Sequence, residues 1–529
     1  MTRPAQIGFA LSMILLLALA AAAILWITPF GVGVTTDSVV YLVGARHLAR
    51  GLDFSLPSVD SPTRLITHYA PFYSILLAAG ELAGVDALTW GRILNTLLFV
   101  ASLFLTLQII LNFAPKKNAE SVITGLLLAG LLLTPFFVLE LFATAWSEAL
   151  FVFLFLLSLQ LVGKYLEAPS GRLLIFAGLA TGAAFLTRYA GAALLIAFCL
   201  VIWLFSRQNT RRRLTGALTF GALAIAPQAF WLLRNLFLTG TTTSRELSFH
   251  PFGKTLVWQA MTTMSSWLLA PETTPTIVKG AILVLAAGGI AYGLWRKVVA
   301  TETSTADLRR RLSESLPGIV LIILVFIPIY FIFLGVSLDF FDANIPMDGR
   351  IFITVYFSIL ILTGYLLQQF VPANRSQRWL KNGVLVLGLA LISGNVFNSA
   401  PSVTAAHQYG LGFENSFWQS SDLLAALKNV PQDLAVYTNV PESIRLYTNR
   451  KVELLPRKFD PANQQTNPNY ANDLETVLQR VRGGEAVIVY YNVLERPNLT
   501  GNGEIQSAPG LLILDTTNDG VIYAAQAFR

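Results

Sequence analysis

The sequence alternates long apolar runs with short polar connections, and this pattern constrains the fold more than any other feature. Hydrophobic residues make up 54% of the 529 residues, charged residues make up only 13%, and the mean hydropathy is +0.60. Soluble globular chains carry about 25% charged residues. Many of the runs reach or approach the ~20 residues that a helix needs to cross a bilayer. The sequence therefore predicts a polytopic α-helical membrane protein.

The basic residues near the ends of these runs predict their direction across the membrane, because Lys and Arg collect on the cytoplasmic side. Basic residues flank the run 173–205 on both sides, at 164–172 and 207–213. We therefore expect two short helices between them, with Arg188 at the outer surface. An arginine at mid-bilayer would cost at least ~2.5–3.5 kcal/mol. Counted in this way, the sequence predicts about eleven transmembrane helices in the cell membrane, a cytoplasmic N-terminus and an extracytoplasmic C-terminus.

Residues 7–27 form the first apolar run, and a cleaved signal peptide is the alternative to a first membrane helix. The run contains A-x-A-like stretches, but it is longer than the roughly 7–15 residues of a signal-peptide core. We therefore expect an uncleaved helix. Among the later runs, 71–85 is short and predicts an interfacial helix, whereas 122–139 predicts a single crossing.

The composition becomes that of a soluble domain from about residue 402. We expect a membrane domain over residues 1–400 and a small extracytoplasmic α/β domain over residues 401–529. Periodicity and turn residues in the second domain predict helices at 420–429 and 470–482 and strands at 433–438, 486–491, 511–514 and 521–524. This domain contains no Gly-rich phosphate loop and no nucleophile elbow.

The charge and the scarcity of cysteine and histidine exclude several classes of function. In a membrane chain the net charge of +7 reflects cytoplasmic Lys and Arg, so no nucleic-acid partner is expected. Cys199 is the only cysteine, which excludes an intrachain disulfide and a Cys-based metal site. The four histidines lack the spacing of metal ligands. These residues identify no certain cofactor, and a divalent cation stays possible.

The first outer loop, residues 31–90, holds the first candidate site residue. Asp37 lies a few residues beyond the first apolar run, where a carboxylate can meet both water-borne and lipid-borne reactants. The residues after it have the pattern of a short amphipathic helix on the interface. An N-cap role is the structural alternative for Asp37, because Asp is common at that position. Tyr41 and His68 lie in the same loop, and purely structural roles are the alternative for them.

Four further charged residues are predicted at outer helix ends: Glu148, Arg188, Arg234 and Arg350. Glu148 would also be favoured at a helix N-terminus by the helix dipole. Arg234 would also snorkel from its helix end, and Arg350 would also cap a loop through Asp348 or Asp342. Arg188 has the strongest case for a functional role, because a charged side chain without a function is unfavourable at a junction between two short helices.

In this order and on this face, the residues resemble the site of the GT-C membrane glycosyltransferases. The likeness is to the family-39-like bacterial branch near the protein O-mannosyltransferases and the lipid A aminoarabinose transferase, and it covers roughly residues 7–370. Those enzymes carry an acidic residue in a long first outer loop with two interfacial helices, and they take sugar from a polyprenyl-phosphate carrier. The resemblance implies the following roles. Asp37 and Glu148 would be catalytic, with Asp37 as the base, and the substrate would be bound by Tyr41, His68, Arg188, Arg234 and Arg350.

Two positions depart from the family pattern. Ser38 stands where the family often has a second acidic residue, and His68-Tyr69-Ala70-Pro71 stands where it often has a charged pair before the proline. These departures leave open the identity of the sugar and the need for a divalent cation. The implied partners are a polyprenyl-phosphate sugar donor, membrane lipids, and an acceptor that is a lipid, a glycan or a protein.

A transporter and a non-enzymatic envelope-assembly protein are the alternative functions. Transporters typically carry charged or broken helices at mid-membrane and internal repeats. In this chain the candidate charges lie at outer helix ends, and no repeat is found. An assembly protein would require no coherent set of an acid and arginines on one face. The sequence therefore favours a glycosyltransferase.

Overall fold

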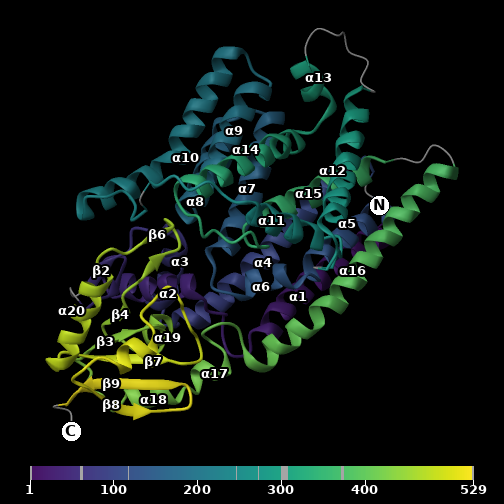
Figure 1. The fold of residues 1–529 in the computed structure, drawn as a ribbon. Coiled ribbons are helices and arrows are strands. Elements are labelled where there is room, and N and C mark those ends of the chain that lie inside the picture. The colour runs from purple at the N-terminus through teal and green to yellow at the C-terminus, as the bar shows by residue number, and fades with distance from the viewer. Residues whose placement is uncertain are drawn as a thin grey trace.

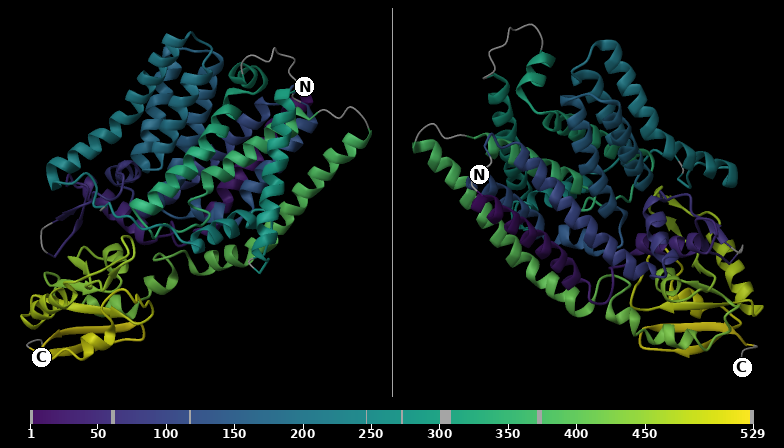
Figure 2. Two further views of the ribbon diagram at one scale, coloured as in Figure 1. Left: turned by 45° about the horizontal axis from the view of Figure 1, so that its top comes forward. Right: turned by 180° about the vertical axis from the view of Figure 1, so that it is seen from behind.

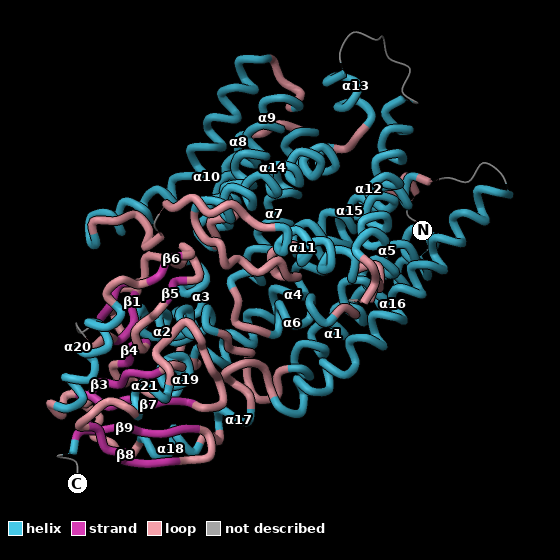
Figure 3. Tube along the Cα trace, in the orientation of Figure 1, coloured by secondary structure: helices cyan, strands magenta, loops and turns pink. Residues whose placement is uncertain are grey.

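The chain folds into a bundle of membrane-type helices with a small α/β domain at one end (Figure 1). The computed structural model describes residues 3–59, 63–116, 118–245, 247–271, 273–299, 308–370 and 375–526. The strands gather at the end of the molecule that also holds the C-terminus (Figure 3). The two ends of the chain lie far apart, with the N-terminus on the helical side (Figure 2).

Seven helices in the described part of the chain are long and apolar enough to cross a membrane. They are α1 (Arg3–Ile27), α4 (Ala87–Asn112), α7 (Ser147–Glu167), α10 (Thr210–Thr239), α12 (Thr276–Val299), α14 (Gly318–Phe340) and α16 (Arg375–Tyr409). Of these, α7 is the most enclosed, whereas α12 and α16 expose most of their apolar surface. A helix that is apolar on an exposed face is suited to contact with lipid.

A bent pair of helices replaces the single crossing that we predicted over residues 122–139. Helices α5 (Ala119–Leu133) and α6 (Phe136–Ala143) meet at 67°. The break falls at Thr134 and Pro135, where proline cannot donate a helical hydrogen bond. Four shorter apolar helices are α3 (Phe72–Leu82), α8 (Gly171–Thr187), α9 (Gly191–Phe205) and α15 (Ile353–Gln369). Eleven crossings require the bent pair and three of these shorter helices to span, so that count stays a prediction.

The two short helices predicted over residues 173–205 are present as α8 and α9, and whether both cross the membrane stays a prediction. Arg188 is the C-terminal cap of α8, and its backbone N–H donates to the carbonyl of Ala184. The turn between the two helices is only three residues long, so Arg188 lies at a sharp corner. The corner fixes the position of this arginine more firmly than a long loop would.

The predicted first outer loop contains two helices, as expected. They are α2 (Thr36–Ala49) and α3, which pack against each other, and a short hairpin of β1 (Ser55–Pro57) and β2 (Thr63–Leu65) lies between them in sequence. The N-cap of α2 is Thr35, so Asp37 lies inside the first turn of the helix. The N-cap alternative for Asp37 is therefore wrong.

The C-terminal domain is built on a five-stranded sheet in the order β4-β3-β7-β9-β8. Its elements in chain order are α17 (Ser416–Gln419), α18 (Asp422–Leu427), β3 (Ala435–Thr438), α19 (Pro441–Tyr447), β4 (Val452–Leu454), β5 (Phe459–Asp460), β6 (Gln465–Thr466), α20 (Tyr470–Arg482), β7 (Ala486–Tyr491), α21 (Asn502–Gln506), β8 (Leu511–Thr516) and β9 (Gly520–Ala525). Strand β3 pairs in parallel with β4 and β7, and β9 pairs antiparallel with β7 and β8. Helix α16 continues past residue 400 to Tyr409, so one helix joins the two predicted domains.

Three segments far apart in the sequence meet where α2 and α7 begin. Gly33 pairs with Thr144 in a parallel bridge, and Val34 pairs with Gly412 in the same way. Helix α2 begins three residues after Gly33, and α7 begins three residues after Thr144. The bridge therefore sets the two helices in register, and the acidic residue in each first turn lies at the same distance from the bridge. The second bridge attaches the link to the C-terminal domain at this point.

Candidate active site

Asp37 and Glu148 occupy equivalent positions at the start of two helices. Each is the second residue of its helix, and neither N-cap residue makes a side-chain capping bond. Trp146 fixes the pair, because its indole N–H donates to the Thr35 hydroxyl at 2.8 Å. Helix N-termini favour negative charge. Glu148 is only 1% exposed, whereas the Asp37 side chain is 33% exposed.

Arg350 lies between the two carboxylates and binds both. Its Nη2 donates to Asp37 Oδ2 at 2.9 Å, and its Nε donates to Glu148 Oε1 at 2.7 Å. Arg188 approaches Glu148 from the α8–α9 corner, with 2.7 Å between its Nη1 and Glu148 Oε1. Two acids and two arginines thus form one connected and electrically balanced cluster. Such charges are stabilised below the surface only when they are paired and hydrogen-bonded.

The Asp37 carboxylate is held in its ionised form. Burial alone would raise its pKa, but the charge and hydrogen bond of Arg350, with the hydrogen bond of Tyr69, bring the pKa below its ordinary value. The Tyr69 hydroxyl donates to Asp37 Oδ1 at 2.8 Å. Burial and the neighbouring Asp37 charge raise the pKa of Tyr69, so the phenol keeps its proton. Asp37 is therefore a fixed anion whose remaining acceptor positions are available on its exposed side.

Arg350 is fixed by more than its two carboxylates. Its guanidinium lies 4.1 Å from the ring centroid of Trp146, in a cation–π contact. Although burial would lower its pKa, Glu148 and Asp37 raise it, so the charge of this guanidinium is permanent. Asp348 caps the loop through the backbone N–H of Arg350 at 2.9 Å and leaves the side chain free to reach the acids. The predicted loop-capping contact of the Arg350 side chain is therefore replaced by contacts with Asp37 and Glu148.

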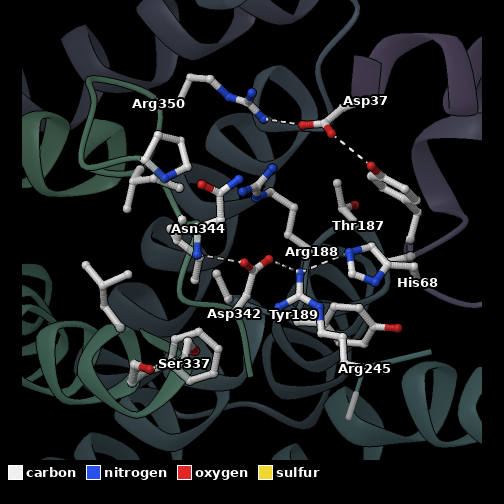
Figure 4. Close-up of a pocket in the computed structure, with 18 of the residues that line it drawn as sticks. Asp37, His68, Thr187, Arg188, Tyr189, Arg245, Ser337, Asp342, Asn344 and Arg350 are labelled. Atoms are coloured by element: carbon white, nitrogen blue, oxygen red, sulfur yellow. Dashed lines mark hydrogen bonds and ion pairs between the residues drawn. The ribbon is translucent and has the colours of Figure 1, made fainter. Parts of the chain in front are cut away.

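A cavity of about 620 Å³, which we call the first cavity, opens beside this cluster (Figure 4). Asp37, Arg188 and Arg350 line its polar part, and Tyr41 and His68 line it as well. Its opposite wall comes from α14 and the following loop, through Phe333, Leu334, Ser337, Ile345 and Pro346. The same loop also brings Asp342 and Asn344 to the cavity. The cavity therefore joins charged residues to an apolar stretch of α14, as a ligand with an anionic head and a lipid tail requires.

A second ion pair, which the sequence did not predict as part of the site, lies across the first cavity. Arg245 lies 3.5 Å from Asp342 and hydrogen-bonds to His68 Nε2 at 3.2 Å (Figure 4). Burial and the charge of Arg245 lower the pKa of His68 to about 4, so this histidine is neutral at pH 7. Arg245 lies in a loop without helical periodicity, so only its position between two outer helix ends could have signalled it.

The structure does not bring all of the predicted residues to the first cavity. The Arg234 guanidinium forms an ion pair with the Asp53 carboxylate at 3.2 Å and lies beside the Trp231 ring. It does not line the cavity. Glu148 also does not line it, because it lies behind the two arginines. Tyr41 bonds to the Ser147 hydroxyl at 3.0 Å, and Arg188 donates to the same hydroxyl at 3.2 Å. Tyr41 therefore supports the Arg188 side chain as well as lining the cavity.

Within the described residues, no three His, Cys, Asp or Glu side chains are grouped as they would be around a metal ion. The charge partners of Asp37 and Glu148 are guanidinium groups. The described residues at this site therefore do not form a set that fits a metal ion.

No protein-family model and no curated protein matches the sequence. Solved structures do match. ArnT from Cupriavidus metallidurans bound to undecaprenyl phosphate aligns over 97% of both chains, with a TM-score of 0.56 and 13% identity. The chain has the GT-C fold.

Two other structures with the GT-C fold are similar over most of the chain. Arabinofuranosyltransferase AftD from Mycobacteria aligns with 97% of this chain at a TM-score of 0.53 and 16% identity. The archaeal oligosaccharyltransferase AglB from Archaeoglobus fulgidus, in complex with an inhibitory peptide and a dolichol-phosphate, aligns with 90% at a TM-score of 0.53 and 12% identity.

The extent of these matches differs among the GT-C structures. The chain covers almost the whole of ArnT but only 41% of AftD and 69% of AglB. The alignment with ArnT includes the C-terminal domain, because it covers 97% of this chain. At these identities the likeness describes the GT-C fold, while the chemistry of the site depends on its own residues.

Proposed function

We propose that the chain is an integral-membrane glycosyltransferase that moves a sugar from a polyprenyl-phosphate carrier to an acceptor hydroxyl. The observation that carries the proposal is the Asp37–Arg350–Glu148–Arg188 cluster beside a cavity that combines charged residues with an apolar stretch of α14. The GT-C fold supports it, as do the undecaprenyl phosphate of the ArnT structure and the dolichol-phosphate of the AglB structure.

The donor phosphate is bound by arginine in this proposal. Arg188 lines the first cavity from the α8–α9 corner, and its side chain is 22% exposed. A guanidinium presents paired N–H donors that suit phosphate oxygens. Arg245 lines the same cavity from the opposite side and is the second candidate for the phosphate. The lipid chain would leave along Phe333 and Leu334 of α14.

Asp37 is the base. The acceptor oxygen attacks the anomeric carbon, and the new C–O bond forms as the bond from that carbon to the phosphate oxygen breaks. The phosphate leaves with the bonding electron pair, and the acceptor proton passes to the Asp37 carboxylate. A positioned base of this kind contributes about 10²–10⁴-fold to the rate. Because its pKa is lowered, Asp37 is ionised and ready to accept the proton at neutral pH.

Glu148 is a positioning residue in this mechanism. It is buried behind Arg188 and Arg350 and lies outside the cavity lining, so it does not reach the reacting atoms. Its carboxylate fixes both guanidinium groups, at 2.7 Å from Arg188 and 2.6 Å from Arg350. Fixed arginines stabilise the charge of the departing phosphate without reorganisation during the reaction. Tyr69 has the same kind of role toward Asp37.

The site is proposed to face the outside of the cell. It lies on the side of the bundle where the C-terminal domain docks, far from the N-terminus (Figures 1 and 2). With a cytoplasmic N-terminus, both the site and the C-terminal domain are extracytoplasmic. The candidate charges cluster at helix ends at one side of the bundle, which favours a transferase over a transporter.

A purified-protein assay tests the proposal. The chain is reconstituted in lipid nanodiscs and given a panel of radiolabelled polyprenyl-phosphate sugars together with lipid, glycan and peptide acceptors. We expect one donor to be consumed with release of polyprenyl phosphate. If no donor is bound or consumed by folded protein across the panel, the proposal is wrong.

A further inference from the structure

A second cavity lies beside the first, between the C-terminal domain on one side and residues 40–69 with the segments around Ser244 and Asp342 on the other. Its volume is about 640 Å³, within the range of ligand-binding pockets. The two cavities share one wall, made of His68, Tyr69, Arg245, Asp342 and Asn344. A ligand in the second cavity would therefore lie directly across this wall from a donor in the first.

The C-terminal domain forms the far side of the second cavity and is attached to its near side. The segment between β5 and β6 reaches the loop before Arg350, where the Ala343 N–H donates to the Ala462 carbonyl at 2.9 Å. Ser58, in the first outer loop, donates to Glu453 at 2.7 Å. The first contact holds the β5–β6 hairpin against the loop that carries Arg350, and the second joins β4 to the segment between β1 and β2. The cavity is thus a defined groove between two anchored walls.

The polar groups of the second cavity combine amides with internally neutralised charges. Three asparagines line it, namely Asn344, Asn463 and Asn498. Two arginine–aspartate pairs line it as well, with Arg245 at 3.5 Å from Asp342 and Arg457 at 3.4 Å from Asp460. Two further arginines of the lining pair with glutamates outside it, Arg64 at 3.8 Å from Glu453 and Arg496 at 3.1 Å from Glu442. Amides and such pairs present donors and acceptors together. This mixture matches hydroxyl groups, which both donate and accept.

The same features argue against the other kinds of acceptor. A lipid acceptor requires a continuous apolar path. Apolar residues such as Val40, Leu56 and Phe341 line part of this cavity, but amides and charged side chains line both of its walls as well. An extended peptide commonly binds by adding to a sheet edge, but the C-terminal domain lines the cavity with loop residues and the ends of short strands. Tyr69, which bonds to Asp37, also lines this cavity, so a hydroxyl at the shared wall would be close to the base.

We infer that the second cavity binds a glycan, and that this glycan is the acceptor of the transfer. The inference rests on the proposed transferase function for its reaction, but the binding of the glycan does not require the donor. The C-terminal domain would then select the acceptor, while the membrane helices bind the donor. Asn463 and Asn498 are the amide side chains that the domain contributes to this selection.

Steric block of the groove provides the test. Asn463→Trp places a large ring in the cavity, and Asn498→Trp does so from a different loop. Gln465→Trp is the matched control, because Gln465 lies on the same hairpin, is exposed and lines neither cavity. Binding is measured with fluorescent hexose and pentose oligosaccharides on detergent-purified protein without donor. Donor hydrolysis, the slow transfer of the sugar from the donor to water, is measured separately.

We expect the wild type and Gln465→Trp to bind at least one oligosaccharide class. Either blocking variant should lose at least about tenfold in affinity for it, which is equivalent to the loss of one charge-assisted hydrogen bond. Donor hydrolysis should be unchanged in all of them. The glycan inference is overturned if no oligosaccharide binds, if the folded blocking variants bind normally, or if only peptide or lipid acceptors are used. In those cases donor consumption would still support the transferase. Conversely, both variants could weaken glycan binding while no donor is consumed. That result would support the glycan site and show that the proposed transferase function is wrong.

Discussion

Arg350 and Asp37 are 313 residues apart in the sequence, and their side chains meet at 2.9 Å. The contact joins the loop after α14 to the first turn of α2, and Glu148 on α7 joins it from behind. Three distant segments therefore contribute to one charge cluster. In our account this contact holds the base and the groups that stabilise the leaving phosphate in a fixed relation.

Replacement of Arg188 by alanine is predicted to weaken use of the donor. A charge-assisted bond to phosphate contributes roughly 1.5–3 kcal/mol, so the apparent donor affinity should fall about tenfold or more. Arg234→Ala is the matched control, because Arg234 also lies near a helix end but outside the first cavity. Titration of radiolabelled donor against both variants is the measurement. Equal donor affinity in folded Arg188→Ala would assign this arginine a purely structural role.

Glu148→Gln is predicted to destabilise the fold as well as reduce activity. The change leaves two arginines beside a neutral amide in a nearly inaccessible site. Breaking a buried pair by removing one partner typically costs about 3–5 kcal/mol. Thermal unfolding in detergent should therefore show a clear drop in Tm. Glu167→Gln, an exposed change at the other end of the same helix, should leave the Tm unaltered.

Gly412→Ala is predicted to disrupt the junction before Asp37. Gly412 has φ +62°, and an added Cβ would lie 1.9 Å from the Val34 carbonyl oxygen. That collision would separate the link to the C-terminal domain from the segment leading into α2. Gly51→Ala is the control for backbone strain alone, because its φ is +74° and nothing lies within 4 Å of the added Cβ. Limited proteolysis should release the C-terminal domain only in Gly412→Ala, and equal resistance of the two variants would contradict this.

A pH dependence of stability is predicted at Glu414, beside the same junction. Burial raises the pKa of Glu414 to about 7, against the hydrogen bonds from Tyr447 and Gln419 that lower it. Its unfolded pKa is about 4.3. Its stabilising contribution is therefore complete below about pH 4.3 and is lost as the pH rises toward 7. The Tm should fall between pH 5 and pH 8 more in the wild type than in Glu414→Gln. An equal fall in both proteins would show that another group is responsible.

The sequence predicted those parts of the fold that local patterns control. Helix α20 and strand β7 have the predicted bounds, because amphipathic periodicity and a Gly-Gly stop determine them. The corner at Arg188 followed from charge placement. The bend at Pro135 was missed, because hydropathy continues across it while helical hydrogen bonding does not.

The site was predictable as a list of outer charges but not as a set of contacts. Asp37, Arg188 and Arg350 came together at the first cavity, whereas Arg234, with the same local signal, did not. The difference depends on how α10 packs, which involves contacts across the bundle. The Arg245–Asp342 pair and Tyr69 were missed for the same reason, since each acts through a partner distant in the sequence.

Asp37→Asn tests the central claim most directly. The substitution keeps the size of the side chain and its place in the first turn of α2, but it removes the basic charge. Because the neutral amide is a weaker acceptor for Arg350, we expect a modest decrease in Tm and a folded protein. Single-turnover transfer from a polyprenyl-linked sugar, at saturating donor, is the measurement. Our account predicts that donor is still bound while the rate of transfer falls by about 10²-fold or more. A folded Asp37→Asn protein that transfers sugar at the wild-type rate would contradict the assignment of Asp37 as the base.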